Sequence, residues 1–352
     1  MRIRRLWIAV VLMGSLCANA SEWPPSLFPT VAQMDALRSD SGWGGFRHAC
    51  SKDMSLVSHP VADFSPAPHY DATGPAPDSD NSPGRTLSRE SLAVYQLAVC
   101  FDISRDARFS GKAEGILEGW ARTTKRIGTL QGADGFNFYF PEALMGAYLL
   151  ESRADWKSSD FSEFVRQVVL PANNAARENN HGNWGVLLLA TAGGFLKDRS
   201  TVMQARQRWM DLLDGQVAAD GSLPLETCRS NTSNWCGGPA KGIKGIGYTH
   251  YALHPTALAA EIFQNLGLSV YGTAESTLLC KAYSRAAFWT LHPEQFPYFK
   301  SNHGQLEGVH DIDYFYILQR RCPAPDGAAV LREFGPGAPD ALDLRGLYPA
   351  NP

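Results

Sequence analysis

Residues 179–197 read NNHGNWGVLLLATAGGFLK, in which a polar cluster around one histidine comes directly before an apolar run. Between 185 and 197 the apolar residues recur at three- and four-residue spacing, which predicts a helix. His181 lies at the beginning of that helix, where the helix dipole favours a neutral imidazole that can accept a proton. The carboxamide of Asn180 can hydrogen-bond a carboxylate without carrying charge. Taken alone, the same turn is more typical of a simple helix cap.

Helical spacing extends along the chain in both directions from this stretch. Ser88 is a suitable N-cap for a helix that continues through Leu92 and Tyr95. Strand signals are few, and neither a fixed-period repeat nor a domain boundary is evident. Helix after helix with short connections predicts an all-α fold, a barrel of antiparallel helical hairpins rather than a βαβ fold. The other helices are expected near 109–125, 139–153, 158–170, 199–214, 253–266, 274–290 and 306–320.

Residues 57–87 interrupt this pattern with many Pro, Ser, Asp and Gly residues. Such a composition predicts a segment without a helix. A loop of this length inside a compact domain is often functional. We therefore interpret it as a possible lid, with His69 and Tyr70 able to reach over a site, or alternatively as a surface linker.

The N-terminus has the three parts of a secretory signal peptide. A basic start at residues 1–5 precedes a short apolar stretch at 6–16, and Ala18-Asn19-Ala20 provides small residues for cleavage after Ala20. The mature chain, residues 21–352, would then be a single domain located in the periplasm or secreted.

Charge limits the partners of this chain. The formal charge is −3, and removing Arg2, Arg4 and Arg5 with the signal peptide makes it −6. A net-acidic protein is not a general binder of polyanions, so an acidic ligand needs a local basic patch. We expect no nucleic-acid partner, no membrane span and a monomer.

The cysteines indicate disulfides. Cys17 leaves with the signal peptide, and the six that remain form an even number in an exported chain. Cys228 and Cys236 bracket a short Asn/Ser-rich loop and are expected to pair. The remaining four allow several connectivities, among which we predict Cys50 with Cys100 and Cys280 with Cys322.

A second candidate for chemistry lies between residues 220 and 255. Arg229 can hold a carboxylate with two parallel hydrogen bonds. The phenol of Tyr248 can act as base or acid if cationic neighbours lower its pKa. Structural roles on a helix explain these residues equally well.

Basic and histidine side chains in the same segment have alternatives of their own. Lys241 and Lys244 either supply the local basic patch or lie on a solvated loop. His250 and His254 have the four-residue spacing of zinc ligands, but no carboxylate base lies between them and no third ligand is evident. We therefore predict no metal site.

Together these motifs resemble the alginate lyase superfamily, whose members have an (α/α) toroid fold. The family's Asn-Asn-His motif corresponds to 179–181. Its Asp-Gly…Leu-Pro-x-Glu-x-x-Arg segment corresponds to 220–229, and its Tyr-x-x-Tyr-Ala-Leu helix to 248–253. Residues 88–98 and 148–156 are similar to further helices of the family. The resemblance implies an incomplete toroid of helical hairpins.

The resemblance also implies a function: a polysaccharide lyase that cleaves a polyuronate, alginate or polymannuronate first, by β-elimination. Asn180 and Arg229 would neutralise the substrate carboxylate, while His181 and Tyr248 would transfer the protons. The product would carry a 4,5-unsaturated uronate, and fixed donors would make a metal or organic cofactor unnecessary. Further contacts with the acidic polysaccharide are expected from Tyr70, Asn179, Trp184, Lys241, Lys244, His250 and Tyr251.

Two departures from the family pattern leave alternatives open. Gly182-Asn183 separates the histidine from Trp184, and the loop at 231–234 lengthens the interval before Tyr248, so that Lys241 or Lys244 could replace Arg229. A non-catalytic polyuronate-binding protein is one alternative. Another is a glycoside hydrolase on the same scaffold, which needs two carboxyl groups at the scissile bond. Candidates for such a pair are Glu142, Asp220, Glu226, Asp311 and Asp313.

Overall fold

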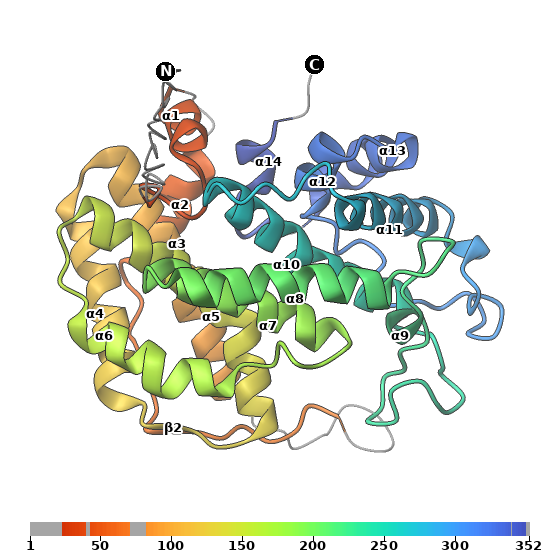
Figure 1. Ribbon diagram of the computed structural model, residues 1–352, viewed down its shortest axis with the longest axis horizontal. Helices are drawn as coiled ribbons and strands as arrows, with labels where there is room; N and C mark the ends of the chain where they lie inside the picture. Colours follow the sequence, from red (N-terminus) through yellow and green to blue (C-terminus); the bar gives the residue numbers. More distant parts are fainter. Residues whose placement is uncertain (1–22, 40–42, 71–81, 339, 350–352) are drawn as a thin grey trace, which may run out of the picture.

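The computed structural model describes residues 23–39, 43–70, 82–338 and 340–349. The predicted signal peptide, residues 1–20, lies outside this part of the chain. Helices make up nearly all of the regular structure and curve around a common centre as an incomplete toroid (Figure 1). The all-α prediction is therefore confirmed.

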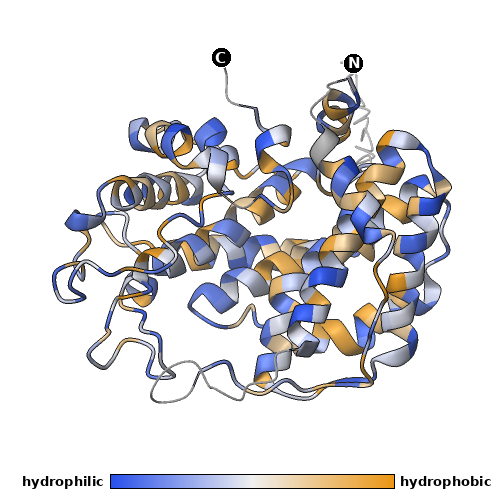
Figure 2. Cartoon of the chain, turned by 180° about the vertical axis from the view of Figure 1, so that it is seen from behind, coloured by the Kyte–Doolittle hydropathy of each residue, from blue (hydrophilic) through white to orange (hydrophobic). Residues whose placement is uncertain are grey.

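The most deeply buried helices of the described chain are α3 (Ser82–Ser104), α5 (Leu130–Arg153), α7 (Asn180–Phe195) and α10 (Gly245–Asn265). Helix α3 packs on α5, α5 on α7, and α7 on α10. Every residue from 182 to 195 in α7 is buried. A helix enclosed on all sides must be apolar all round, which explains the continuous hydrophobic run after Asn183. Figure 2 shows hydrophobic residues gathered where these helices face one another.

A second set of helices packs around the first: α4 (Ala107–Thr123), α6 (Ser159–Phe164), α8 (Arg199–Gln216) and α11 (Ala274–Leu291). Helix α4 contacts α3, α8 contacts α7, and α11 contacts α10, each partner following the other through a short connection. Such neighbours are antiparallel hairpins. Helix α4 buries one stripe at helical spacing, which includes Ala113, Ile116 and Trp120.

Shorter elements complete the described chain. Strands β1 (Asp63–Phe64) and β2 (Arg126–Ile127) pair in parallel. Helix α6 continues as a π turn at Val165–Val169 and a 3₁₀ turn at Leu170–Ala172. The remaining helices are α1 (Val31–Ser39), α2 (Gly44–Asp53), α9 (Pro224–Thr227), α12 (Phe315–Arg321), α13 (Pro325–Glu333) and α14 (Leu344–Leu347), with 3₁₀ turns at Pro293–Gln295 and Gly335–Gly337.

The prediction that residues 57–87 hold no helix is wrong for 82–87. Helix α3 begins at Ser82, and Pro83 lies in its first turn. There the missing N–H removes no intrahelical hydrogen bond, and the fixed φ of proline suits the helix. Tyr70 ends the described part before this helix, and residues 71–81 of the predicted lid lie outside the described chain.

Other predicted helix boundaries also move, and α7 begins at Asn180 instead of 185. Helix α5 begins at Leu130 instead of 139, and α10 begins at Gly245 instead of 253. Residues 306–314 are not helical, so α12 is much shorter than predicted. Gly308 has a φ of 69°, a left-handed conformation that a continuous α-helix does not contain.

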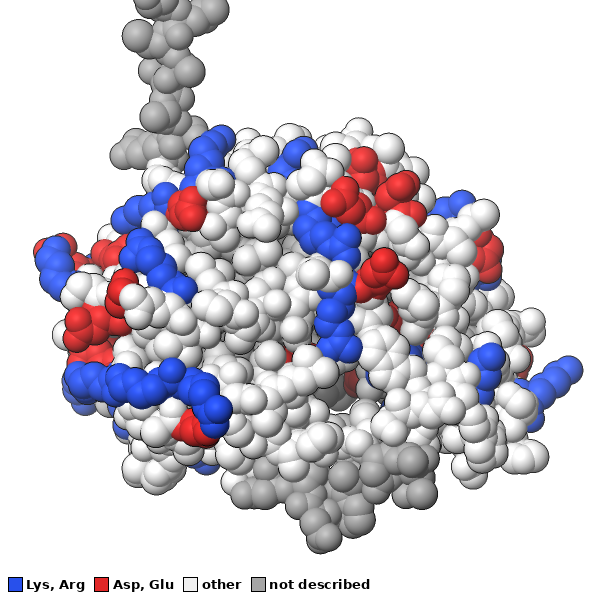
Figure 3. All heavy atoms as spheres, turned by 60° about the horizontal axis from the view of Figure 1, so that its bottom comes forward, with Lys and Arg blue, Asp and Glu red and all other residues white. Residues whose placement is uncertain are grey.

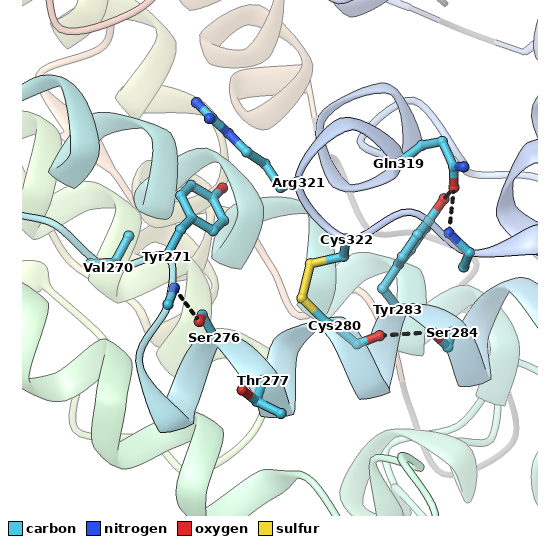
Figure 4. Close-up of a disulfide and its surroundings, with 12 residues drawn as sticks. Val270, Tyr271, Ser276, Thr277, Cys280, Tyr283, Ser284, Gln319, Arg321 and Cys322 are labelled. Carbon is cyan, nitrogen blue, oxygen red and sulfur yellow. Dashed lines mark hydrogen bonds between the residues drawn. A yellow bond between two sulfur atoms is a disulfide. The ribbon is translucent and has the colours of Figure 1, made fainter.

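All three predicted disulfides are present: Cys50–Cys100, Cys228–Cys236 and Cys280–Cys322. The last joins α11 to the residue after α12, close to the hydrogen bond from Tyr283 to Gln319 (Figure 4). Disulfides are typical of proteins in oxidising compartments, so these bonds fit a periplasmic or secreted protein. None of the described helices is long and apolar enough to span a membrane.

Candidate active site

A pocket of about 610 Å³ opens at one end of the toroid. Figure 3 shows the molecule hollowed on this side, with basic and acidic side chains close together at the rim. Segments far apart in the sequence meet here: residues 64–70, the beginnings of α5, α7 and α10, the loop 229–235, and residues 307–311.

His181 lies on the wall of this pocket in the first turn of α7. Its Nδ1 is 2.8 Å from Oδ1 of Asp134 on α5. Burial lowers the pKa of His181, while the hydrogen bond and charge of Asp134 raise it and Arg177 and Arg229 lower it. The net direction is downward, so the imidazole is neutral in its resting state. With Nδ1 donating to Asp134, the lone pair on Nε2 is free to accept a proton.

Asn180 begins α7 and also lines the pocket. Its backbone N–H and its side-chain Nδ2 donate to the two carboxyl oxygens of Glu226, at 2.6 and 2.8 Å. Burial raises the pKa of Glu226, while Arg229 and the two bonds from Asn180 lower it. The carboxamide nitrogen carries two protons, and the bond to Glu226 uses one of them.

Arg229 follows α9 and lines the pocket, although it is only 4 % exposed. Its guanidinium carbon stands 4.0 Å from the ring centre of Tyr248 and 4.7 Å from that of Trp235. Nε and Nη1 have no hydrogen-bond partner among the described residues. A buried cation with unused donors is costly unless an anion joins it, so this guanidinium is suited to bind an anionic group.

Tyr248 stands in the first turns of α10, beside Arg229. Its hydroxyl donates to the hydroxyl of Tyr70 at 3.4 Å, and Nζ of Lys244 donates to the same Tyr70 oxygen at 2.9 Å. Burial raises the pKa of Tyr248 more than Arg229 and Lys244 lower it, so the phenol is protonated in the resting state. The condition for a resting tyrosinate base, a lowered pKa, is not met. The phenol is suited to donate a proton.

Trp235 was not predicted as a site residue, yet it closes one side of the pocket. Its ring is 40 % exposed and stacks on His181 at 6.2 Å between ring centres, with 13° between the planes. The Cys228–Cys236 disulfide and a hydrogen bond from the Ser230 N–H to the Trp235 carbonyl hold its loop. Exposed aromatic faces of this kind stack well on sugar rings.

A family model of alginate lyases matches residues 41–296, most of the chain. The chain belongs to the alginate lyase family. It is therefore a polysaccharide lyase. No curated protein gives a significant match.

Solved structures of alginate lyases share the toroid of this family member. The alginate lyase of Bacteroides ovatus has 16% identity and a TM-score of 0.68, with 91% of this chain and 98% of that chain covered. Alginate lyase A1-III of Sphingomonas species A1 has 14% identity and a TM-score of 0.71, with 94% and 97% covered. At these identities the similarity establishes the fold.

Three of the residues named for substrate contact from the family resemblance lie on the pocket wall: Tyr70, Lys244 and Tyr251. The other four are not among its lining residues. Trp184 packs on Phe138 and stacks on His254. Lys241 stands 5.5 Å from the ring centre of Tyr298, and Asn179 is buried at the N-cap of α7.

His250 is also enclosed in the core of this alginate lyase family member. Its ring nitrogens meet the hydroxyls of Tyr314 and Thr290 and the carbonyl of Val309. Burial lowers its pKa to about 4, so the ring is neutral and serves the core. His254 instead contacts Asp313, at 2.8 Å. The two histidines thus bind different partners, and no cluster of metal-ligating side chains is found among the described residues.

The carboxyl groups proposed for a hydrolase do not form a pair in this pocket. Asp220 accepts bonds from Ser222 in a surface turn, and Glu226 holds Asn180. Of the five candidates, Asp311 alone lines the pocket. Asp134 and Glu307 also line it, but each is already in contact with a basic side chain. This arrangement fits the lyase family and disfavours two-carboxylate hydrolysis.

Glu142, which interacts with His254 and Asp313, leads to a prediction about the stability of the protein. Burial raises its pKa from 4.5 to about 8, with a smaller raising effect of Asp313 and a lowering effect of His254. Between these two pH values the folded state holds a proton that the unfolded state releases. The contribution of Glu142 to the free energy of unfolding is therefore fully present below about pH 4.5 and is lost as pH rises through about 8. We expect the Tm of wild type to fall over that range and that of Glu142→Gln to fall less. Scanning calorimetry with exposed Glu163→Gln as control measures this, and parallel curves for all three proteins would contradict it.

Proposed function

We propose that this enzyme cleaves a uronate-containing polysaccharide by β-elimination. The observation that carries the proposal is the buried guanidinium of Arg229, with unused donors, beside a protonated Tyr248. The family match supports alginate as the first substrate to test. A single-residue variant of alginate lyase A1-III has been solved in complex with a tetrasaccharide, which supports an oligosaccharide as the ligand of this fold.

The first requirement of the reaction is to acidify the proton on C5, next to the substrate carboxylate. Arg229 would bind that carboxylate through its free Nε and Nη1, and Asn180 would add the second proton of its amide. Negative charge moves onto the carboxylate as the C5 proton leaves. Donors that are already fixed and shielded from water stabilise this charge most strongly.

The second requirement is a base and an acid. Nε2 of His181 would take the C5 proton, since Asp134 holds Nδ1 and burial keeps the ring neutral. The electron pair of the C5–H bond forms the C4=C5 double bond, and the bond from C4 to the glycosidic oxygen breaks. Tyr248 would give its proton to that oxygen. The products are a new reducing end and a 4,5-unsaturated uronate.

The hydrogen bonds around Tyr248 offer a way to restore its proton. The phenolate left after the reaction faces the hydroxyl of Tyr70, which in turn accepts from Lys244. A proton can return along this short chain of oxygens and nitrogen. Fixed donors perform the charge neutralisation, so the proposal gives no role to a metal or organic cofactor.

The decisive experiment incubates the mature protein with polymannuronate, polyguluronate and glucuronan and follows the ultraviolet absorbance of the unsaturated uronate. Growth of that absorbance together with reducing ends supports elimination. New reducing ends without the absorbance would support a hydrolase instead. Binding without either signal would support a non-catalytic polysaccharide-binding protein.

Arg229→Lys tests the carboxylate site. Lysine keeps the charge but loses the planar pair of donors, so we expect kcat/KM to fall about 10- to 100-fold, the cost of one or two charge-assisted hydrogen bonds. Arg285→Lys is the matched control, because that guanidinium also lies over two aromatic rings, Phe288 and Trp289, on α11. Equal kinetics in both variants would remove Arg229 from the site.

A further inference from the structure

The charged residues that line the pocket balance one another. Among the described residues these are three basic side chains and three carboxyl groups: Arg177, Arg229, Lys244, Asp134, Glu307 and Asp311. A pocket made for several adjacent uronates would have an excess of positive charge.

Two of the three cations already have a carboxylate partner. Arg177 lies 3.4 Å from Asp134, and Lys244 lies 3.3 Å from Glu307. Arg229 makes no ion pair with a described residue, and two of its nitrogens lack a hydrogen-bond acceptor. Arg229 is therefore the basic side chain of the described wall that has donors left for a substrate carboxylate.

Asp311 is the counterpart of Arg229, a carboxyl group on the pocket wall that makes no hydrogen bond or ion pair with a described residue. Two glycines fix the segment that carries it. A side-chain carbon on Gly308 would lie 3.0 Å from Oδ2 of Asp311 and 2.8 Å from Cα of Gly247. The 307–311 segment thus packs directly on the first turn of α10, and Asp311 lines the same pocket as Tyr248.

We propose that the sugar on the Tyr248 side of the scissile bond is uncharged, so that the substrate alternates a uronate with a neutral or N-acetylated sugar. This rests on the elimination proposed above, in which Tyr248 protonates the oxygen that stays with that sugar. A carboxylate at this position repels a second uronate, whereas hydroxyl or amide N–H groups can donate to it. Specificity for the substrate therefore comes from repulsion by Asp311 as much as from attraction by Arg229.

The test compares two polymers with the same reacting unit and the same linkage at C4. One is a β-1,4 glucuronate homopolymer, and the other alternates glucuronate with N-acetylglucosamine. We expect kcat/KM at least about tenfold higher on the alternating polymer, the effect of one unfavourable charge contact. Mass spectrometry should find the uncharged sugar at the new reducing end.

Asp311→Asn should raise kcat/KM on the homopolymer severalfold, because it removes the repulsive charge and keeps the shape of the side chain. The ratio of kcat/KM between the alternating polymer and the homopolymer should therefore fall. Asp155→Asn is the control, since Asp155 has a side chain that is 98% exposed and lies in the α5–α6 connection. Equal or better cleavage of the homopolymer by wild type would overturn the substrate assignment while leaving elimination intact. Absence of unsaturated product from every polymer would overturn the proposed function itself.

Discussion

Replacing Tyr248 with phenylalanine is expected to lower kcat for elimination by about 10²- to 10⁴-fold, the usual contribution of a positioned general acid. The variant removes one oxygen and keeps the ring that Arg229 faces. A glycosidic oxygen that departs without a proton is a poor leaving group, so the loss of activity should appear mainly in kcat. Initial rates of ultraviolet absorbance under saturating substrate measure it.

The matched control is Tyr283→Phe. Tyr283 is fully buried on α11 and donates its hydroxyl to Gln319, so this variant loses a comparable hydrogen bond away from the pocket. We expect near wild-type kcat from it, and a similar Tm for both variants. Normal turnover by Tyr248→Phe with an intact fold would exclude Tyr248 as the acid.

His181→Ala should cost a similar factor, about 10²- to 10⁴-fold in kcat, because it removes the group assigned as base. The space left beside Trp235 and Asp134 should admit free imidazole, so added imidazole is expected to restore part of the rate. A purely structural role for His181 would not give this rescue.

His292→Ala serves as the control for that experiment. His292 lies at the C-terminal end of α11, half-exposed and outside the pocket lining, so its loss should change neither kcat nor the response to imidazole. Turnover by His181→Ala within a few-fold of wild type would assign the base to another group.

Much of the fold could be predicted because apolar spacing decides which helices are buried. Prediction from the sequence failed where tertiary contacts override the local preference for helix. The first turn of α10 contains Gly245 and Gly247, which are poor helix formers. Yet a side-chain carbon at Gly245 would lie 2.1 Å from the Thr227 carbonyl, so close packing requires glycine there. Close packing of this kind is invisible to spacing rules.

In the site, too, local motifs could be predicted from the sequence and tertiary contacts could not. Asn180, His181, Arg229 and Tyr248 were predicted from motifs, and all four line one pocket. Asp134 was not predicted, because its contact with His181 joins residues 47 positions apart and no local pattern marks it. Trp184 was assigned to the substrate from its neighbours in sequence, but a helix turns successive side chains in different directions.

Glu226 gives the site a property that single substitutions will not reveal. It binds Asn180 through both carboxyl oxygens, and burial raises its pKa while the charge of Arg229 opposes that rise. Both groups assigned to the substrate carboxylate therefore interact with Glu226, Asn180 by hydrogen bonds and Arg229 through its charge. Their contributions to the transition state are energetically coupled and cannot be divided between them. A change in the substrate group bound at this position therefore requires Asn180, Glu226 and Arg229 to be substituted together.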